Sequence, residues 1–485
     1  MLPQVQRADD PERNAPVEKS SQTNAESDAV DRNVNSYCPK KWQSHVTILS
    51  CYIANFSDGF QNSLANPTNV IFKELLGAGG YSSDMKTRIS NSLIIGAILG
   101  VVVLGYTSDM FSRRSGLLFT SGLVAIATLL STLALQVRPS ENMLWYFVVV
   151  RGVAGFGVGG EYPPSAAAGL EESDEIMRAY RGPLFVSFTT LMATLASPIL
   201  QIVYLICLVA SNNNLTITFH AIYGIAAVLP VVIIVLRIFM VDSTLFHNSN
   251  FINRRRSFRL YLLLARRYWW RIFTTSLAFF LYDFINFPNS IMSSSIIASL
   301  VKDNDIRKTA IWQVVLAVLP VPGVMVGAWL TNAIGRRNTG IMGFAGYMLL
   351  GFIIGGTYSR LSKNIAAFVV LYGLLQAFGH MGPGATIGLI SSEAFPTAMR
   401  GMGYGIATAF GRTGAAVGTE CFTPLQEVAG SSSTFYLAGG VAVIGILVYC
   451  LLPESSGLDL AQEDRELEGF LAERGYSMEK DTSLS

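Results

Sequence analysis

The sequence predicts an all-α membrane protein in which twelve transmembrane helices form two pseudo-symmetric halves of six. Three observations lead to this fold class. Hydrophobic residues make up 51% of the 485 residues and charged residues only 14%, whereas soluble proteins have about 25% charged residues. Apolar runs of roughly the 20 residues that cross a bilayer recur along the chain. Short motifs from the first half also return in the second at a nearly constant offset.

Twelve apolar segments are long enough to cross a bilayer at about 1.5 Å of rise per residue. They cover residues 44–66, 90–108, 115–136, 143–169, 183–209, 217–240, 270–298, 309–331, 338–357, 364–391, 401–424 and 433–452. The polar residues 1–43 lack the apolar core of a signal peptide and predict a disordered cytosolic tail, and residues 453–485 predict a second one. We therefore expect a six-helix bundle over 44–240, a linker over 241–268 and a second bundle over 269–452.

The distribution of lysine and arginine predicts the orientation, because loops rich in these residues stay in the cytosol. If the N-terminus is cytosolic, the inside loops hold the arginine pairs and the Arg-rich linker 241–268, and both termini are cytosolic. The linker could bind nucleic acid or anionic lipid, but this orientation signal explains it more simply. The net charge of +2 gives no general attraction for nucleic acid. The sequon at Asn214 lies in a loop too short to indicate glycosylation.

Nothing in the sequence points to a cofactor, a metal or an enzyme. The chain has four histidines without an HExxH motif, and its five cysteines have no metal-like spacing. No nucleophile and base stand in a recognisable arrangement. The glycine run in residues 151–167 could be mistaken for a dinucleotide fingerprint, but it lies inside an apolar helix and not after a strand.

An internal repeat supports the two halves. GYTSDMFSRR begins at Gly105 and GAWLTNAIGRR begins at Gly327, which is an offset of 222 residues. The same offset joins Phe156-Gly157 to Phe378-Gly379, Glu171 to Glu393 and Arg178 to Arg400, and Asp58 and Asp283 differ by 225. Parallel six-helix repeats of this kind occur in the major facilitator superfamily.

The first copy resembles the cytosolic loop motif of major facilitator transporters, G-x3-D-x2/3-[RK]-R. A carboxylate and a guanidinium there can latch the inner ends of neighbouring helices, and the latch must break when the halves rock. The second copy keeps two arginines but has Asn332 in place of the acid, which predicts a weaker, uncharged latch. The alternative for each copy is an ordinary stop-transfer charge cluster. The expected latch residues are Asp109, Arg113, Arg114, Arg336 and Arg337.

Several ionisable residues lie near the middle of predicted spans. Each costs at least about 2.5–3.5 kcal/mol on insertion, so a functional role is the default interpretation. The candidates are Asp58, Arg151, Glu161, Asp283 and Arg412. The alternative is a set of structural ion pairs, such as Arg151 with Asp58. Glu420 lies nearer a span end and could reach water, and His380 could shuttle protons or serve a structural role in a Gly-rich bend.

Two of these residues have informative neighbours. Phe279, Asp283 and Phe287 are spaced four residues apart and share one helix face. An acid between two rings suits a proton-dependent gate, although the rings could also face lipid or pack in the core. Arg412 lies in AFGRTGAAVG, whose small residues allow close helix approach and leave room for an anion. Arginine binds phosphate bidentately.

The segment RGVAGFGVGGEYPPSAA, beginning at Arg151, resembles the G-x-G-x-G-G-[DE]-Y-P-x-S signature of the phosphate:proton symporter family. MGPGATIGLISSEAFPTAMRG is similar to a later segment of that family. The resemblance implies that an acid in the first span, an Arg and an acid in the fourth, and an acid in the seventh carry proton coupling. These positions match Asp58, Arg151, Glu161 and Asp283. It also implies that Tyr162 faces the substrate.

The chain departs from the inorganic phosphate porters of that family. Their seventh-span Trp and Tyr are Phe279 and Phe287 here, their tenth-span Asn is Gly384, and their eleventh-span Lys is Arg412. Their fifth-span Gln has no counterpart near Thr189. The pocket thus loses hydrogen-bond donors, gains room at Gly384 and keeps one strong cation, which suits a phosphodiester with a bulky polar group. FLYDFINFPNSI resembles the fungal glycerophosphodiester permeases, a branch that includes carriers of glycerophosphoinositol and glycerophosphocholine.

The resemblance implies a proton-coupled plasma-membrane transporter that imports an anionic glycerophosphodiester by alternating access. A proton on Asp283 would neutralise the carboxylate that repels the anionic substrate, which docks on Arg412. Asp58 or Glu161 could take a proton as well. The expected substrate-binding residues are Arg412, Asp283, Tyr162, Phe279, Phe287, Gly384 and Thr189. The expected partners are protons, a small organophosphate and the bilayer, and no nucleic acid. The protein is expected to be a monomer.

Two other functions stay open. Inorganic phosphate:proton symport is the nearer one. A nutrient sensor of the same fold is the other, although tails of about 43 and 33 residues are short for one. A membrane enzyme lacks a catalytic constellation, and a channel fits less well than alternating access to a twofold repeat with intramembrane charges.

Overall fold

The computed structural model describes residues 41–107, 113–177, 180–239, 258–301, 305–396, 399–456 and 460–474. These residues are almost entirely helical and contain no strand. Within them, nine helical segments have the length and apolar composition of a membrane span. Three further segments of similar length complete the twelve expected spans. They are the first, seventh and eleventh, which carry Asp58, Asp283 and Arg412.

The first half supplies six of these spans. They are α2 (Lys41–Ser63) with α3 (Ala65–Gly80), α4 (Ser83–Thr107), α5 (Arg113–Thr132), α6 (Ser140–Met177), the run α7 (Arg181–Val186), η3 (Ser187–Leu191) and α8 (Met192–Ala210), and α9 (Leu215–Ile238). A short 3-10 turn, η1 (Ala134–Gln136), lies between α5 and α6. The fifth span is continuous in direction but passes through a π-helical turn at η3.

The second half supplies the other six spans. They are α12 (Trp269–Leu300), α13 (Ile306–Val318) with α14 (Pro320–Ala333), α15 (Arg336–Leu361), the run α16 (Ile365–Gly379), η5 (His380–Gly384) and α17 (Ala385–Glu393), α18 (Arg400–Ala429) and α19 (Ser431–Leu451). The π-helical turn η5 contains Pro383, which has no N–H to donate and whose ring disturbs the preceding turn. Such turns often occur at functional sites.

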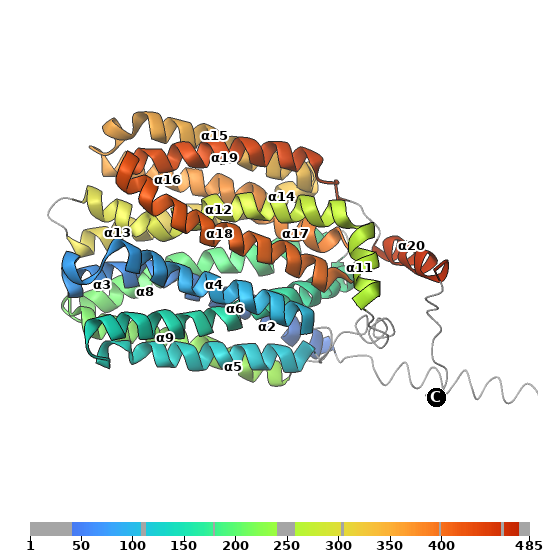
Figure 1. Ribbon diagram of the computed structural model, residues 1–485, viewed down its shortest axis with the longest axis horizontal. Coiled ribbons are helices and arrows are strands. Elements are labelled where there is room, and N and C mark those ends of the chain that lie inside the picture. Colours follow the sequence, from blue (N-terminus) through green and yellow to red (C-terminus); the bar gives the residue numbers. More distant parts are fainter. Residues whose placement is uncertain are drawn as a thin grey trace, which may run out of the picture.

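Figure 1 shows these helices running side by side, with first-half helices in blue to green below and second-half helices in yellow to red above. Two core clusters support the halves: one gathers around Tyr347, Tyr372 and Phe435, and the other around Phe72 and Phe147. The predicted fold class is therefore confirmed.

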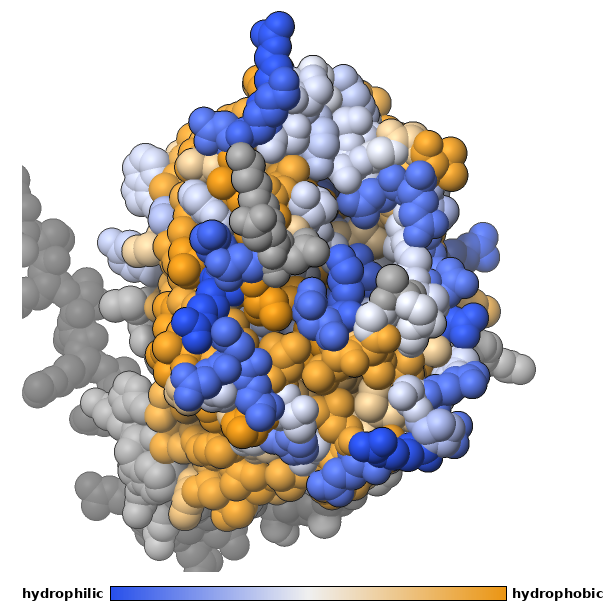
Figure 2. All heavy atoms as spheres, turned by 90° about the vertical axis from the view of Figure 1, so that its left-hand side faces the viewer, coloured by the Kyte–Doolittle hydropathy of each residue, from blue (hydrophilic) through white to orange (hydrophobic). Residues whose placement is uncertain are grey.

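The outer surface of the bundle is apolar, as a lipid-facing surface must be. Large side chains such as Ile126, Trp329 and Leu447 are exposed on several helices, where contact with water would be costly and contact with lipid tails is not. Figure 2, which faces the end of the molecule at the left of Figure 1, shows polar side chains gathered across that end and apolar ones along its left and lower edges.

One close helix approach sets the geometry of the site. Gly414 lies against the backbone of α12, and a Cβ atom there would overlap the carbonyl oxygen of Phe280. The missing side chain therefore lets α18 pack directly on α12. This contact brings Arg412, two residues earlier, beside Asp283, three residues after Phe280.

The expectation of a disordered C-terminal tail is wrong for α20 (Leu460–Ala472), at the right-hand end of Figure 1 beside α11 (Phe258–Arg267). Leu467 and Leu471 bury one apolar stripe of α20 against a cluster that includes residues of α11. Arg271 of α12 forms a bidentate ion pair with Glu463 at 3.1 Å for both contacts. Two leucines one turn apart are a weak signal in a short segment that is rich in acidic residues. The predicted N-terminal tail lies almost wholly outside the described residues.

Candidate functional site

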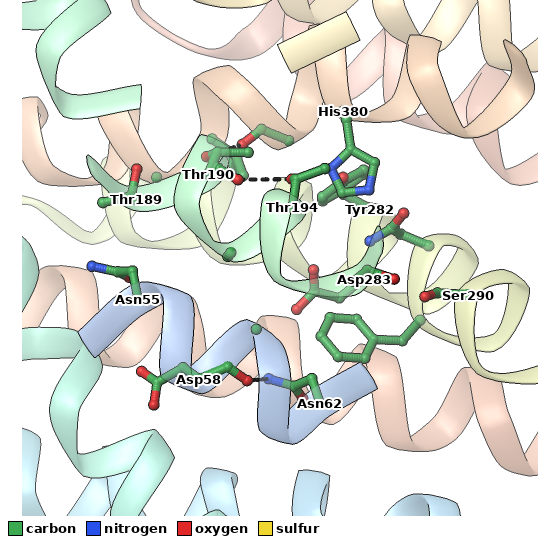
Figure 3. A pocket seen from close by; sticks show the side chains of 18 of the residues that line it. Asn55, Asp58, Asn62, Thr189, Thr190, Thr194, Tyr282, Asp283, Ser290 and His380 are labelled. Atoms are coloured by element: carbon green, nitrogen blue, oxygen red, sulfur yellow. Dashed lines mark hydrogen bonds between the residues drawn. The ribbon is translucent and has the colours of Figure 1, made fainter. Parts of the chain in front are cut away.

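A cavity of about 240 Å³ lies between the two halves. Its lining comes from α2 and the fifth span of the first half, and from α12, the eighth span, the tenth span and α18 of the second, with Tyr162 of α6. Figure 3 shows the same arrangement, with side chains from α2, from the fifth span and from α12 converging on one space. A cavity shared by both halves is where a substrate would have to sit if the halves move against each other.

Arg412 is the centre of the charged part of this cavity. Its Nη1 atom lies 3.4 Å from Oδ2 of Asp283. Its guanidinium carbon lies 4.8 Å from the ring centre of Tyr162 and 4.6 Å from that of Phe287, so two aromatic faces hold the cation between them. Its buried Nε atom has no hydrogen-bond partner in the described part of the chain. The guanidinium is thus fixed in place with donors to spare for an anion.

Asp58 lines the same cavity and differs from Asp283 in having no cation in ion-pair contact, although Arg237 and Arg412 are close enough to act on its charge. Only 4% of Asp58 is exposed, yet none of the described side chains forms an ion pair or hydrogen bond with its carboxylate. The expected alternative, a pair between Arg151 and Asp58, is not formed. Arg151 instead contacts the hydroxyl of Tyr223 at 3.5 Å and the carbonyl oxygen of Gln61 at 3.3 Å.

Glu161 is held in a buried ion pair and is not among the residues that line the cavity, although its charge acts on Asp58. Its two carboxylate oxygens accept from Arg237 of α9 at 2.7 and 3.1 Å. The hydroxyls of Thr120 and Ser121 on α5 donate to the same carboxylate at 3.2 and 3.1 Å, and Arg237 also contacts Ser121. The sequence interpretation missed Arg237, because an arginine near the end of an apolar run is also what the positive-inside rule predicts.

The structure brings most of the predicted site residues together. All seven expected substrate-binding residues line the cavity, namely Arg412, Asp283, Tyr162, Phe279, Phe287, Gly384 and Thr189. Of the four expected coupling residues, Asp58 and Asp283 line it, whereas Arg151 and Glu161 do not. The polar lining residues that sequence reasoning missed include Asn286, Gln376 and Thr194. Their only signal was a polar side chain within an apolar run.

The extra room expected at Gly384 is wrong. A Cβ atom on Gly384 would lie 2.5 Å from the hydroxyl oxygen of Tyr282. The tyrosine of α12 therefore fills the space that the missing side chain leaves. The sequence singles out the adjacent residue, Asp283, as a charge within an apolar span. Nothing in the sequence indicates that Tyr282 reaches the tenth span.

The twofold repeat is visible inside the cavity. Arg412 of the eleventh span covers Tyr162 of the fourth. At the same 222-residue offset, Thr190 of the fifth span donates a hydrogen bond to the carbonyl oxygen of Gly384 in the tenth, at 2.9 Å. The two contacts join the halves at equivalent places. One carries a cation and a ring, and the other carries only neutral hydrogen-bonding groups, so the cavity has a charged side and a neutral side.

The predicted latch is charged in its second copy, contrary to expectation. Glu393 of α17 accepts from Arg181 of α7 at 2.9 Å, and the Arg336 guanidinium lies 3.4 Å from the same carboxylate. Ser455 also donates to Glu393 at 2.7 Å. The acid comes from another helix, so Asn332 need not supply it. This cluster joins the two halves at the end of the molecule that carries α20.

The remaining latch residues are only partly described. Asp109 lies outside the described residues, as do the side chains of Arg113 and Arg114. Arg337 begins α15 with Arg336, and the backbone N–H groups of these two residues donate to the carboxylate of Glu454 at 2.9 and 3.1 Å. In the second copy, therefore, one arginine side chain forms the cross-half cluster and both arginines help to fix the helix start.

Comparison with known proteins agrees with this architecture. The family described as "Sugar (and other) transporter" matches residues 42–259 and again residues 249–467. The chain is 76% identical to MFS-type transporter lnaF of Aspergillus flavus, over 92% of this chain and 90% of that protein. It is 35% identical to glycerophosphoinositol transporter 1 of Saccharomyces cerevisiae, over 90% and 84%. It is 33% identical to glycerophosphoinositol permease 1 of Candida albicans, over 90% and 83%.

Solved structures share the fold at low sequence identity. The proton:xylose symporter XylE, a major facilitator superfamily protein, superposes with a TM-score of 0.70 at 17% identity, over 87% of this chain and 98% of that one. A partially occluded inward-open form of XylE from E. coli gives 0.69 at 15% identity, over 86% and 100%. The chain is therefore a multi-pass membrane transporter that belongs to the sugar (and other) transporter family of the major facilitator superfamily.

Proposed function

We propose that this protein is a proton-coupled transporter that imports an anionic glycerophosphodiester, such as glycerophosphoinositol, across the plasma membrane. The observation that carries the proposal is the pair of Arg412 and Asp283 in a cavity shared by both halves. The names of the relatives that are 33–35% identical support the substrate class. Both termini and the end with α20 then face the cytosol, as the arginine distribution favours.

Proton coupling follows from competition for one guanidinium. The carboxylate of Asp283 and the phosphate of a diester are both anions that Arg412 can bind. A proton on Asp283 removes the competing charge, so the guanidinium can donate two parallel hydrogen bonds to the phosphate. On the side of lower proton activity, Asp283 loses the proton, pairs again with Arg412 and displaces the substrate. Asp58 is a second proton site, because it lines the cavity and its carboxylate has no ion-pair contact among the described residues.

Glu161 has a structural role in this proposal. Its carboxylate accepts from one arginine and two hydroxyls and does not face the cavity. A proton on this carboxylate would cancel its attraction for Arg237, so we assign Glu161 to holding the first half together. In this proposal the two acids that line the cavity, Asp58 and Asp283, carry the protons.

Alternating access requires contacts that break in turn at the two ends. At the end with α20, Glu393 joins the halves through Arg181. Toward the other end, Asn91 of α4 donates to Glu420 of α18 at 2.7 Å. Both sets hold in this conformation, so the halves are joined on both sides of the cavity. We infer that each set opens while the other stays closed.

The test is uptake of labelled glycerophosphoinositol, glycerophosphocholine and inorganic phosphate in cells that lack their own carriers, at acidic and at slightly alkaline pH. Acid-stimulated uptake of a diester is expected. Uptake of phosphate alone would contradict the substrate class and favour an inorganic phosphate symporter. Binding of a diester without accumulation would contradict transport and favour a sensor.

Asp283→Asn is expected to abolish acid-stimulated accumulation while leaving exchange of substrate across the membrane. The amide cannot take a proton, but it also no longer competes with the phosphate for Arg412. Proteoliposomes with an imposed proton gradient measure accumulation, and the same vesicles without a gradient measure exchange. Glu473→Gln, an exposed acid near the end of α20, is the matched control. Unchanged gradient-driven accumulation in Asp283→Asn would contradict the coupling mechanism.

A further inference from the structure

We propose that the neutral side of the cavity is a headgroup subsite, in which Gln376 and His380, the latter oriented by Thr194, bind the hydroxyl groups of an uncharged polyol such as an inositol ring. This inference rests on the proposed transport of a phosphodiester and adds its selectivity. Arg412 would hold the phosphate, and the neutral side would choose among the groups that the phosphate carries.

Gln376 provides a hydrogen-bond donor that has no well-formed hydrogen bond; the polar side chain it interacts with is Tyr372, one turn earlier. The side chain lines the cavity from α16 and is only 7% exposed. Its buried Nε2 atom makes no well-formed hydrogen bond to any of the described residues. Buried amide groups are normally paired, because an unpaired one has lost its hydrogen bonds to water. An amide at the wall of a cavity whose donor lacks a well-formed hydrogen bond is therefore available to a ligand that accepts hydrogen bonds, once a small rotation of the side chain turns it inward.

His380 provides an acceptor one turn further along the same span. Thr194 donates its single hydroxyl proton to the carbonyl oxygen of Thr190, at 2.7 Å. The same hydroxyl lies 3.3 Å from Nδ1 of His380. With its proton on the carbonyl of Thr190, the hydroxyl accepts from Nδ1–H, and we assign this tautomer to His380. The tautomer leaves Nε2 of the neutral ring as an acceptor. Figure 3 shows the imidazole beside Thr194.

The donor on Gln376 and the acceptor on His380 are spaced so that neighbouring hydroxyl groups of a polyol could bind both. Gln376 and His380 are four residues apart on one helical run and so lie on the same face. Each hydroxyl of a polyol both donates and accepts, and neighbouring hydroxyls on a ring can engage two such groups at once. The pair therefore fits vicinal hydroxyls better than a trimethylammonium group, which has no hydrogen to donate to Nε2 and no lone pair for the amide.

The charged side chains of the cavity are not in contact with Gln376 or His380. Within the described lining, the carboxylates and the guanidinium belong to Asp58, Asp283 and Arg412. No ion pair or hydrogen bond joins a carboxylate to Gln376 or His380 among the described residues. Figure 3 shows His380 across the pocket from Asp58. A cationic headgroup would find no negative charge in contact with the neutral side.

The experiment measures KM for uptake of glycerophosphoinositol and of glycerophosphocholine in Gln376→Leu and in the wild type, with maximal rates divided by the amount of protein at the cell surface. Leucine keeps the volume and removes the amide. The expected result is a KM for glycerophosphoinositol raised by about tenfold, the scale of one hydrogen-bonded contact, with the KM for glycerophosphocholine changed by less than about twofold. Thr194→Val, which removes the acceptor for Nδ1 without changing shape, is expected to shift selectivity in the same direction.

Gln313→Leu is the matched control. Gln313 is also a buried glutamine with an unpartnered Nε2 atom, but it lies on α13 outside the cavity, so both KM values are expected to stay unchanged. An equal rise in both KM values for Gln376→Leu, or no rise in either variant, would overturn the subsite. Wild-type protein that carries neither diester would instead contradict the proposed function, so the two failures are distinct.

Discussion

Arg412→Ala is expected to reduce uptake of every substrate by at least about 100-fold relative to the wild type, per molecule of transporter at the cell surface. Arg412 is the single arginine or lysine in the described lining of the cavity. The substitution removes two charge-assisted hydrogen bonds to a phosphate, which are worth about 1.5–3 kcal/mol each, and tenfold in affinity corresponds to about 1.4 kcal/mol. It also leaves Asp283 as an unpaired carboxylate that repels the anion. Initial uptake rates per molecule at the cell surface measure the effect.

Two further variants separate binding from folding. Arg412→Lys keeps the charge but not the planar pair of donors, so a smaller loss of uptake is expected. Arg412→Ala combined with Asp283→Asn removes the uncompensated acid and is expected to restore protein abundance without restoring uptake. If Arg412→Ala carries substrate at a rate near that of the wild type, the phosphate is bound elsewhere and the proposed mechanism fails.

The sequence was a good guide to residues whose chemistry is unusual for their surroundings. A charge within an apolar run is costly, so Asp58, Asp283 and Arg412 could be selected without knowledge of the fold. The twofold repeat could also be found, because motifs at a constant offset need only the sequence. Those two signals were enough for the fold class and for the charged side of the cavity.

The sequence was a poor guide wherever a partner comes from a distant helix. Gly384 seemed to leave room until Tyr282, over 100 positions earlier, proved to fill it. Asn332 seemed to leave the second latch uncharged, although Glu393 supplies the acid. In each case the deciding contact depends on how helices pack, and helical periodicity describes one helix at a time. Gln376 was missed because an unpaired donor can be recognised only once its neighbours are known.

Glu161 and Arg237 form the buried pair whose disruption is expected to destabilise the protein most. The side chains are 3% and 1% exposed and contact each other at 2.7 Å. Arg237→Leu leaves a buried carboxylate without its cation, and such single replacements cost about 3–5 kcal/mol. Glu161→Leu strands the cation in the same way. Thermal unfolding of the purified protein in lipid nanodiscs measures the loss, and Lys308→Ala, in the exposed pair with Asp305, is the control that should change little.

The double variant Glu161→Leu/Arg237→Leu then distinguishes structure from coupling. Removing both charges together eliminates the uncompensated group, so most of the lost stability is expected to return. If Glu161 serves structure alone, the double variant should also keep acid-stimulated uptake, since Asp58 and Asp283 still face the cavity. Recovery of stability with loss of the pH response would contradict this assignment and return Glu161 to the proton pathway. The full cycle of single and double variants gives the interaction free energy between Glu161 and Arg237, which measures how much the ion pair contributes to stability.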